Sequence, residues 1–449
     1  MAIDHSIAIR NFLSTSPRSA RDLADGMGIS QPTVSRALRA MVDDVIRFGP
    51  YQSIQYALRR PLLAEGNIPV FRVTPEGRLE KHGELSPVHP QGYVMTEASG
   101  NACLCDGFPW WLHDMWPQGF LGRAFVAAQA SRLGLPERLG DWQEEHVLRA
   151  LLSPFGGDAV GNLLLGEWAR EHFIRQPDPV PIAAEEIPAA YARRAEQAMA
   201  GEAPASSAGG EQPKFTAFAE TPDGPRHVLV KFTLPGENPI TQRWRDLLLA
   251  EHHALRLLRE HGLGAVSTRV VDHGEQRFLE VERFDRNGSR GRRGLISLTA
   301  MDAEFVGLGR GGWPGMTARL TSERLITPAA HDGACRLHAF GTLIGNTDMH
   351  PGNLSFVTDS GRPYELAPAY DMLPMAFAPR SSGELPETWP APGIDSNVPA
   401  SLWREMERLA RQYLERLQAE PAFSPGFAPC LRALEAHLQE AGTRIGRLA

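Results

Sequence analysis

Two polar residues, Asp348 and Asn353, lie five positions apart in a turn-rich segment between two apolar runs. A second carboxylate, Asp371, follows in the segment Ala369-Tyr-Asp-Met372. A phosphotransferase needs this arrangement, with one carboxylate beside the attacking hydroxyl and an amide oxygen plus a second carboxylate holding Mg²⁺ against the nucleotide phosphates. The pattern therefore predicts phosphate transfer, with the preceding residues 337–344 as a helix and residues 354–357 as a strand.

Lysine is rare in this chain: of 46 basic side chains, only Lys81, Lys214 and Lys231 are not arginine. A compact ammonium contacts phosphate as a point charge, a role in which the bulkier guanidinium fork is a poor substitute. Lys231 lies in the apolar, strand-like run 228–232, and Lys214 closes the small-residue loop 206–214 just before it. We interpret both as phosphate contacts rather than chance placements, and we expect Lys81 on the surface.

Length and composition are those of a globular protein with two or three domains. The chain has 449 residues, 42% apolar and 22% charged, with a net charge of −7. No run of about 18 apolar residues and no secretory signal occurs, and the four cysteines fit a reducing compartment, so a cytoplasmic protein without a membrane partner is expected. The negative net charge argues against nucleic-acid binding over the whole surface but permits a local patch.

Residues 1–80 are predicted to form a winged helix–turn–helix domain that binds DNA. Ser19 can cap a first helix, and Ser30 with Pro32 opens a second helix whose apolar side packs inward. Residues 45–58 read as two short strands around a Gly-Pro turn, the wing. Residues 1–60 carry eight arginines against five acids, a net +3, which favours phosphate contact. The alternative is a winged helix that serves only protein contacts.

The second of these helices supplies the candidate DNA contacts. Its apolar residues Val34 and Leu38 leave a polar side free for solvent or DNA, and the exposed start of such a helix enters the groove in this class of domain. Ser35 and Arg36 are the leading candidates. The full polar set is Gln31, Thr33, Ser35, Arg36 and Arg39.

The elements around the lysines are clearer than those before them. Residues 85–205 give a weak signal, in which the aromatic-rich stretch 109–123 is either a ligand platform or, as we favour, packing against a sheet. The apolar spacing of residues 244–261 predicts a helix with Glu251 on its apolar stripe. Glu251 either pairs with Lys231 or reaches water at the boundary. The glycine-rich stretch 306–313 is predicted as a mobile loop, and the C-terminal half as mainly helical.

Taken in order, these motifs resemble the HipA family of bacterial serine/threonine kinases, and more narrowly its YjjJ-type branch with a fused helix–turn–helix. The likeness covers roughly residues 90–449. It rests on Ser206-Ser-Ala-Gly-Gly-x-x-Pro-Lys214, Val230-Lys231, Val281-Glu-Arg-Phe-Asp-Arg286, Ile344-Gly-Asn-Thr-Asp348-Met-His350 with Asn353, and Tyr370-Asp371. The resemblance implies an α+β, two-lobed protein-kinase-like fold with relatives among the phosphatidylinositol kinases. Residues 85–285 would form the N-lobe and residues 286–449 the mainly helical C-lobe.

The resemblance also implies ATP and Mg²⁺ as cofactors and a protein as the phosphate acceptor. Asp348 would orient or deprotonate the acceptor hydroxyl, Asn353 and Asp371 would bind Mg²⁺, and His350 would contact phosphate or, as we favour, support the loop. Lys231 would contact the α/β-phosphates. The remaining nucleotide contacts would come from the loop with Ser206, Ser207, Gly209, Gly210 and Lys214, and from Glu282 and Phe284 at the adenine hinge.

Relatives in this family act as toxins of toxin–antitoxin pairs, and a serine of the glycine loop is autophosphorylated, which blocks ATP binding. Ser206 or Ser207 would be that serine here. Because this chain carries its own helix–turn–helix, its dependence on a separate antitoxin is in doubt. Two alternatives to a protein kinase remain open: a small-molecule phosphotransferase, and a DNA-binding regulator whose kinase-like part senses nucleotide.

Overall fold

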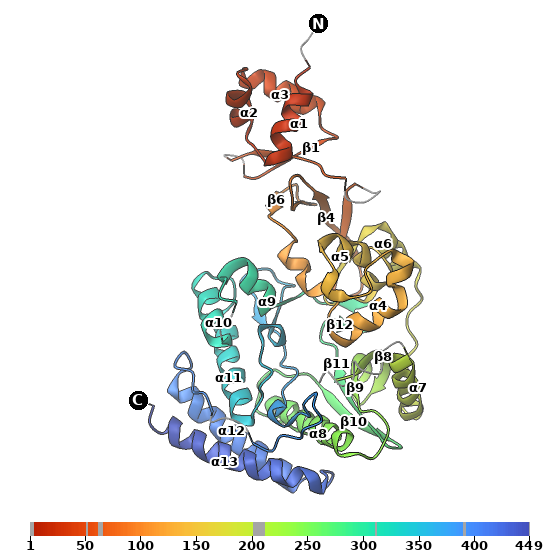
Figure 1. Cartoon of the computed structure of the whole chain (residues 1–449), viewed down its shortest axis with the longest axis vertical. Helices are drawn as coiled ribbons and strands as arrows, with labels where there is room; N and C mark the ends of the chain where they lie inside the picture. Colours follow the sequence, from red (N-terminus) through yellow and green to blue (C-terminus); the bar gives the residue numbers. More distant parts are fainter. Residues whose placement is uncertain are drawn as a thin grey trace. The chain divides into compact units, whose positions relative to one another are not determined.

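The structure is a computed structural model that describes residues 4–50, 53–61, 66–200, 212–309, 312–388 and 392–448. The chain divides into two compact units (Figure 1). The first comprises Met1–Thr74, Arg78–Trp116 and Trp142–Gln176; the second comprises Pro75–Gly77, Pro117–Asp141 and Pro177–Ala449. No helix in the described ranges is both long enough and apolar enough to cross a membrane.

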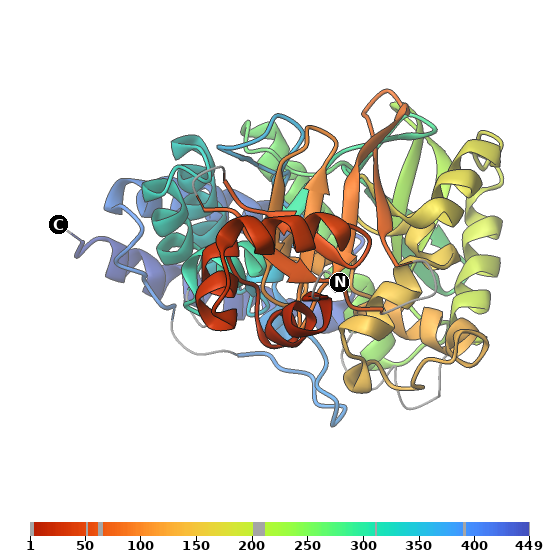
Figure 2. The same cartoon turned by 90° about the horizontal axis from the view of Figure 1, so that it is seen from above.

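Three short helices open the first unit: α1 (Ser6–Thr15), α2 (Ala20–Met27) and α3 (Gln31–Ala40). Figure 2 shows them, in red, gathered into one small bundle. The Ser19 side chain accepts from the Asp22 N–H and the Asp22 carboxylate accepts in return, so α2 begins with a capping box. Ser30 caps α3, which has a proline in its first turn. The predicted helix–turn–helix is therefore confirmed.

The predicted wing is also present, as antiparallel strands β1 (Val45–Phe48) and β2 (Gln55–Leu58). Buried Phe48 and Ala57 share a core with Val94 of a five-stranded sheet and with Val88 just after one of its strands, so the wing and this sheet form one unit. The sheet has the order β6-β5-β4-β3-β7. Its strands are β3 (Ile68–Val73), β4 (Leu79–Pro87), β5 (Tyr93–Glu97), β6 (Ala102–Cys105) and β7 (Leu163–Leu165).

This sheet changes where the domain boundary lies. Its helices are α5 (Glu144–Leu151) and α6 (Gly166–Arg175), and β7 pairs with β3 across a long stretch of chain. The sequence prediction ended the first domain at residue 80 and assigned residues 85–285 to the N-lobe. In the structure, residues 78–116 and 142–176 group with the N-terminal helices instead, because β3 and β4 are neighbours in one sheet.

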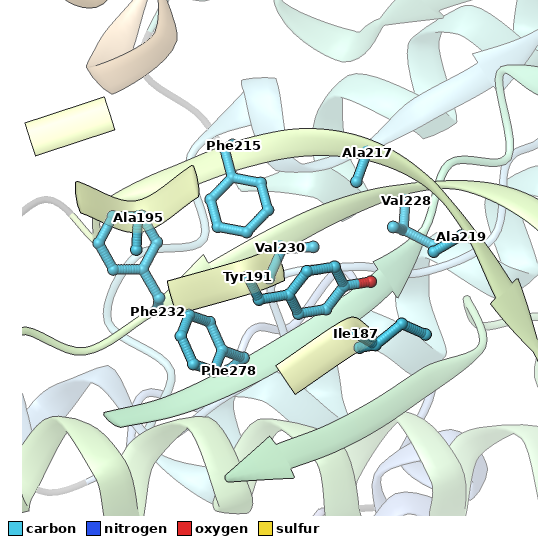
Figure 3. Close-up of a cluster of buried hydrophobic side chains, with 10 residues drawn as sticks. All are labelled: Ile187, Tyr191, Ala195, Phe215, Ala217, Ala219, Val228, Val230, Phe232 and Phe278. Atoms are coloured by element: carbon cyan, nitrogen blue, oxygen red, sulfur yellow. The ribbon is translucent and has the colours of Figure 1, made fainter. Parts of the chain in front are cut away.

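The second unit begins with α4 (Gly119–Leu133) and contains an antiparallel sheet of order β10-β11-β9-β8. The strands are β8 (Lys214–Thr221), β9 (Gly224–Phe232), β10 (Thr268–His273) and β11 (Gln276–Glu282). Helix α7 (Ile187–Ala200) packs on one face, where Tyr191 meets Phe215, Phe232 and Phe278 (Figure 3). Because side chains alternate along a strand, Lys231 points to the opposite face, toward α8 (Pro239–Glu260).

The rest of the second unit is mainly helical, as predicted. It contains α9 (Leu298–Met301), α10 (Trp313–Ser322), α11 (Pro328–Ile344), α12 (Ala400–Ala419) and α13 (Ala428–Ile445). Short strands β14 (Leu295–Ser297), β15 (Ser355–Val357) and β16 (Glu365–Leu366) form a sheet, and β12 (Arg286–Asn287) pairs with β13 (Gly291–Arg292). The loop predicted for residues 306–313 is shorter in the structure, since a π-helix spans Asp302–Val306 and Trp313 opens α10.

Candidate active site

The predicted phosphate lysine lies at the centre of a buried charge cluster. Lys231 Nζ is 2.6 Å from Glu251 Oε1, 2.8 Å from Glu251 Oε2 and 2.6 Å from Asp371 Oδ1. An ammonium has three N–H donors, so these contacts use all of them. The structure therefore favours the ion-pair interpretation of Glu251, whose side chain is 0% exposed, over the boundary interpretation.

The cluster joins three elements that are distant in sequence. Lys231 comes from β9, Glu251 from α8, and Asp371 from the segment after β16. A carboxylate buried on an apolar helix face is costly unless a cation compensates it, which explains why Glu251 and Lys231 face each other. Asp371 differs, because a third of its side chain remains exposed. It can therefore exchange its contact with Lys231 for one with a ligand.

Asn346 links the backbones of Asp348 and Asp371 and is a site residue that the sequence analysis missed. Its Nδ2 donates to the Asp371 carbonyl oxygen at 3.1 Å, while its Oδ1 accepts from the Asp348 N–H at 3.0 Å. Asp371 has φ of 53°, a left-handed conformation that is uncommon outside glycine and that needs such support. Asn346 stands inside the Ile344-Gly-Asn-Thr-Asp348 motif, but no local signal shows that its amide spans two segments.

The turn after α11 carries Asp348 and Asn353 together, as predicted. Asn353 Nδ2 donates to the Asp348 carbonyl oxygen at 2.8 Å, and Asn353 ends the 3₁₀ helix Pro351–Asn353. The side chain of His350 caps that short helix, with Nδ1 accepting from the Gly352 N–H at 3.0 Å. This contact is one of loop support, the role that the sequence analysis favoured for His350.

Burial and neighbouring charges together shift the pKa values of Asp348 and Asp371 in opposite directions. Burial raises the pKa of Asp348, and Asp371 adds to this, although His350, Lys214 and Lys231 work against it. For Asp371, burial acts to raise the pKa, but Lys231 and then Lys214 outweigh it and leave the pKa lowered. Asp371 is therefore held ionised, and Asp348 is the better proton acceptor of the two.

Asn353 and Asp371 carry oxygens of the type that a magnesium ion takes as ligands. Because Asn353 uses its Nδ2 as a donor, its amide oxygen is the group left to act as a ligand. Asp371 adds an ionised carboxylate, and oxygen is the ligand type that Mg²⁺ prefers. Among the described residues, no group of three or more His, Cys, Asp or Glu side chains could hold a metal. A magnesium ion that also takes phosphate oxygens from a nucleotide requires no such group.

The structure brings Lys214 to the same cluster. Lys214 opens β8 and lies directly across from Lys231 in the β8–β9 pair, so both side chains point to the same face. Two like charges side by side repel, and the carboxylates of Glu251 and Asp371 offset this repulsion. The glycine-loop candidates Ser206, Ser207, Gly209 and Gly210 lie outside the described residues.

The hinge candidates have defined contacts of their own. Glu282 ends β11, its N–H donates to the Ser267 carbonyl oxygen at 2.9 Å, and its carboxylate lies 3.3 Å from Arg226 Nε. Phe284 stacks on Tyr370 with 5.6 Å between ring centroids, next to Asp371 in sequence. The Glu282 N–H is therefore already bonded, while the Phe284 ring connects the hinge to the segment that carries Asp371.

The candidate DNA contacts all lie on α3 of the first unit. Gln31, Arg36 and Arg39 are exposed, whereas Ser35 is half-buried. Thr33 is also half-buried, and its hydroxyl lies 2.8 Å from Ser30 Oγ at the helix cap. Val34 and Leu38 are buried as predicted, so α3 presents its polar side outward.

A surface hollow of about 470 Å³ lies in the first unit, apart from these candidates. Its lining residues are Phe71, Leu79, Lys81, Glu167, Arg170 and Ile174. The two cations are already paired, Lys81 Nζ with Glu84 at 2.8 Å and Arg170 with Glu167 at 3.2 Å. The hollow therefore offers no uncompensated charge to a ligand, and Lys81 is a surface residue as predicted.

Comparison with known proteins gives three matches to family descriptions. Residues 7–44 match the arsR family of bacterial regulatory proteins, residues 64–174 match the middle domain of YjjJ-like toxins, and residues 206–422 match the HipA-like C-terminal domain. The toxin YjjJ of Escherichia coli K12 is 41% identical over 442 residues, which cover 98% of this chain and 99% of that protein.

A solved structure supports the fold. The Shewanella oneidensis MR-1 complex of HipA, HipB and operator DNA contains a chain that is 18% identical, with a TM-score of 0.52. The match covers 84% of this chain and 97% of that one. At this identity the likeness concerns the fold alone.

Proposed function

The chain belongs to the YjjJ-like branch of HipA-like toxins, with a fused N-terminal helix–turn–helix, and from this premise we propose that it is a protein kinase. With ATP and Mg²⁺ it transfers the γ-phosphate to a serine or threonine hydroxyl of a protein. Its second unit is a two-lobed kinase-like domain, with the β8–β11 sheet in one lobe and α10–α13 in the other.

One observation carries the proposal: a fully buried lysine–glutamate pair that also holds a partly exposed aspartate. A structural ion pair would need only Lys231 and Glu251. The added contact to Asp371 places an exchangeable carboxylate beside a fixed ammonium, which is what a site that binds metal-bound phosphates requires. Lys214, in register with Lys231, adds positive charge for the phosphates.

Each residue of the site would have a separate role in the transfer. Bound Mg²⁺, held by Asn353 and Asp371, would neutralise charge on the nucleotide phosphates. Lys231, kept in place by Glu251, would contact the α/β-phosphates. Asp348 would receive the hydroxyl proton as the acceptor oxygen forms its bond to the γ-phosphorus and the bond to the β–γ bridging oxygen breaks, releasing ADP.

The test is transfer of label from γ-³²P-ATP to protein, with Mg²⁺ or with excess EDTA, using the full chain and a bacterial lysate. Labelled phosphoserine or phosphothreonine in the magnesium sample, absent with EDTA and absent for Lys231→Met, is the expected result. Label found only on small molecules would replace the protein acceptor with a small one. No transfer at all, together with measurable ATP binding, would favour nucleotide sensing over catalysis.

The first unit is proposed to bind DNA through α3. The exposed Gln31, Arg36 and Arg39, together with the net positive charge of residues 1–60, support a groove and phosphate contact. Since the chain has its own helix–turn–helix, DNA contact would need no separate antitoxin. Selection of bound fragments from genomic DNA tests this, and recovery of no enriched sequence by the full chain would leave the winged helix as a protein-contact module.

A further inference from the structure

We propose that Trp313 is a positioning residue for the turn 348–353, which carries Asp348 and Asn353. The inference rests on the proposed phosphate transfer and adds a residue to that site. It starts from one contact: Trp313 Nε1 donates to the carbonyl oxygen of His350 at 3.1 Å, and Trp313 is only 1% exposed. A buried indole thus reaches the middle of the turn, at the backbone of His350, whose side chain is exposed.

The turn is held at its two ends by other contacts. At its start, Asn346 Oδ1 accepts from the Asp348 N–H. At its end, the Tyr370 hydroxyl donates to the Gly352 carbonyl oxygen at 2.9 Å, and the Leu298 N–H donates to the Leu354 carbonyl oxygen at 2.7 Å. Between these anchors the turn bonds to itself, through Asn353 to Asp348 and through His350 to Gly352. The His350 carbonyl oxygen also accepts from the Asn353 N–H inside the turn at 3.0 Å. The indole bond therefore ties the middle of the turn to α10.

Trp313 is itself rigidly placed. It is the first residue of α10, with Pro314 next and Gly312 as the cap. A Cβ on Gly312 would lie 3.2 Å from Asp395 Oδ2, so the backbone approaches its neighbours closely there. The indole also packs beside His338 of α11, with 6.3 Å between ring centroids. Because α11 leads directly into the turn, Trp313 ties the turn to the helix that precedes it.

The segment before Trp313 is folded by a buried carboxylate. Asp302, at the start of the π-helix, accepts from the Leu308 N–H at 3.0 Å and from the Gly309 N–H at 2.8 Å. These bonds make the residues from Asp302 to Gly309 a closed, self-bonded unit. Single-turn π-helices are frequent beside functional sites. Here the π-helix lies between two elements that contact the turn, α9 through Leu298 and α10 through Trp313.

The expected consequence concerns the turnover rate rather than nucleotide binding. Loss of the indole N–H would let the His350 carbonyl, and with it Asp348, move relative to the acceptor hydroxyl. A displacement of about 1 Å in a reacting group costs on the order of 100-fold in rate. The proposed phosphate contacts Lys214 and Lys231 come from other elements, the strands β8 and β9. We therefore expect Trp313→Phe to lower kcat by about 10- to 100-fold and to leave the KM for ATP within about twofold.

The chain offers a matched control in Trp403. Its Nε1 donates to the Asp395 carbonyl oxygen, also at 3.1 Å, and Trp403 is 0% exposed. Trp403→Phe removes the same kind of buried bond from the same unit, at a carbonyl that lies outside the turn 348–353. Both variants should show a similar fall in Tm, since each removes one of two donors to a carbonyl oxygen. The Asn353 N–H still donates to the His350 carbonyl oxygen, and the Val398 N–H to that of Asp395. Only Trp313→Phe should lose turnover.

The experiment measures kcat, the KM for ATP and Tm of the full chain as wild type, Trp313→Phe and Trp403→Phe, with the protein acceptor labelled in the lysate assay. A third variant carries benzothienylalanine at position 313, which keeps the ring volume and lacks the N–H. It stands in if Trp313→Phe fails to fold. Loss of kcat with unchanged KM for ATP, in the position-313 variants only, supports the inference. Equal kcat values for wild type and the position-313 variants, or equal losses at both positions, would overturn it, whereas an inactive wild type would refute the proposed function itself.

Discussion

The polar side of α3 and the cluster around Lys231 are built in opposite ways. The α3 candidates lie within nine residues of one helix, and their side chains reach outward from a small apolar core. The Lys231 cluster draws on two strands, a helix and a loop between residues 214 and 371, and buries its key charges. The first surface is therefore local and tolerant of change, while the second depends on the whole fold of its unit.

The largest effect is expected from removing Glu251, the buried acid of the Lys231 cluster. Glu251→Leu leaves the Lys231 ammonium buried with one partner instead of two, and breaking such a pair costs about 3 kcal/mol of unfolding free energy. Denaturant unfolding of the second unit, followed separately from the first, measures this. A loss below about 1 kcal/mol would show that the pair is not the structural centre of the cluster.

A double variant at Lys231 and Glu251 separates the effect on unfolding free energy from the effect on phosphate transfer. Lys231→Met together with Glu251→Leu replaces the pair with apolar groups of similar size, which is often neutral for stability. Asp371 reaches water and can remain charged without Lys231. Most of the lost stability should return, while phosphate transfer stays absent. Recovery of transfer in the double variant would remove Lys231 from the proposed mechanism.

Removing a surface charge from α3 should have a smaller effect, which concerns DNA binding and leaves phosphate transfer unchanged. Arg36→Ala should weaken binding to a selected DNA fragment by about tenfold and reduce the slope of log affinity against log salt by about one. The control is Arg21→Ala on α2, an arginine whose side chain is 83% exposed and outside the predicted contact surface. Equal losses for both variants would point to general electrostatics instead of α3, and any loss of phosphate transfer would contradict the separation.

The smallest expected effect is a shift in pH dependence. Asp348 must be ionised to accept a proton, and burial raises its pKa above the ordinary value. Transfer should therefore fall, as pH decreases, at a higher pH than for an ordinary aspartate. Lys214 acts to lower this pKa, so Lys214→Met should move the acid limb of kcat/KM further up, while Lys81→Met should not. If the acid limb of the kcat/KM profile stayed in place or moved to lower pH in Lys214→Met, Asp348 would not be the group that accepts the proton.

The elements that could be predicted from the sequence are those that depend on local signals. The caps at Ser19 and Ser30 are local signals that predicted α2 and α3, and the Gly-Pro turn predicted the wing. The sequence analysis did not predict α1. The pairing of Lys231 with Glu251 was within reach, because an acid on an apolar stripe and a lysine in an apolar strand each lack a partner until they meet.

What sequence reasoning missed depends on contacts between distant segments. Strand β7 is only three residues long and pairs with β3, so the sheet that shifts the domain boundary has no continuous pattern. Asn346 reads as an ordinary turn residue and Trp313 as part of a glycine-rich loop. Their bonds to Asp371 and His350 appear only when α10, α11 and the later loop are folded together.

The decisive measurement is the rate of phosphate transfer by Asp348→Asn relative to wild type, with ATP binding measured on the same preparation. Asparagine keeps the size of the side chain and loses the proton-accepting carboxylate. A general base contributes roughly 100- to 10,000-fold, so transfer should fall by at least 100-fold while ATP affinity stays within about threefold. A variant that transfers phosphate at the wild-type rate would contradict the assignment of this turn as the catalytic centre.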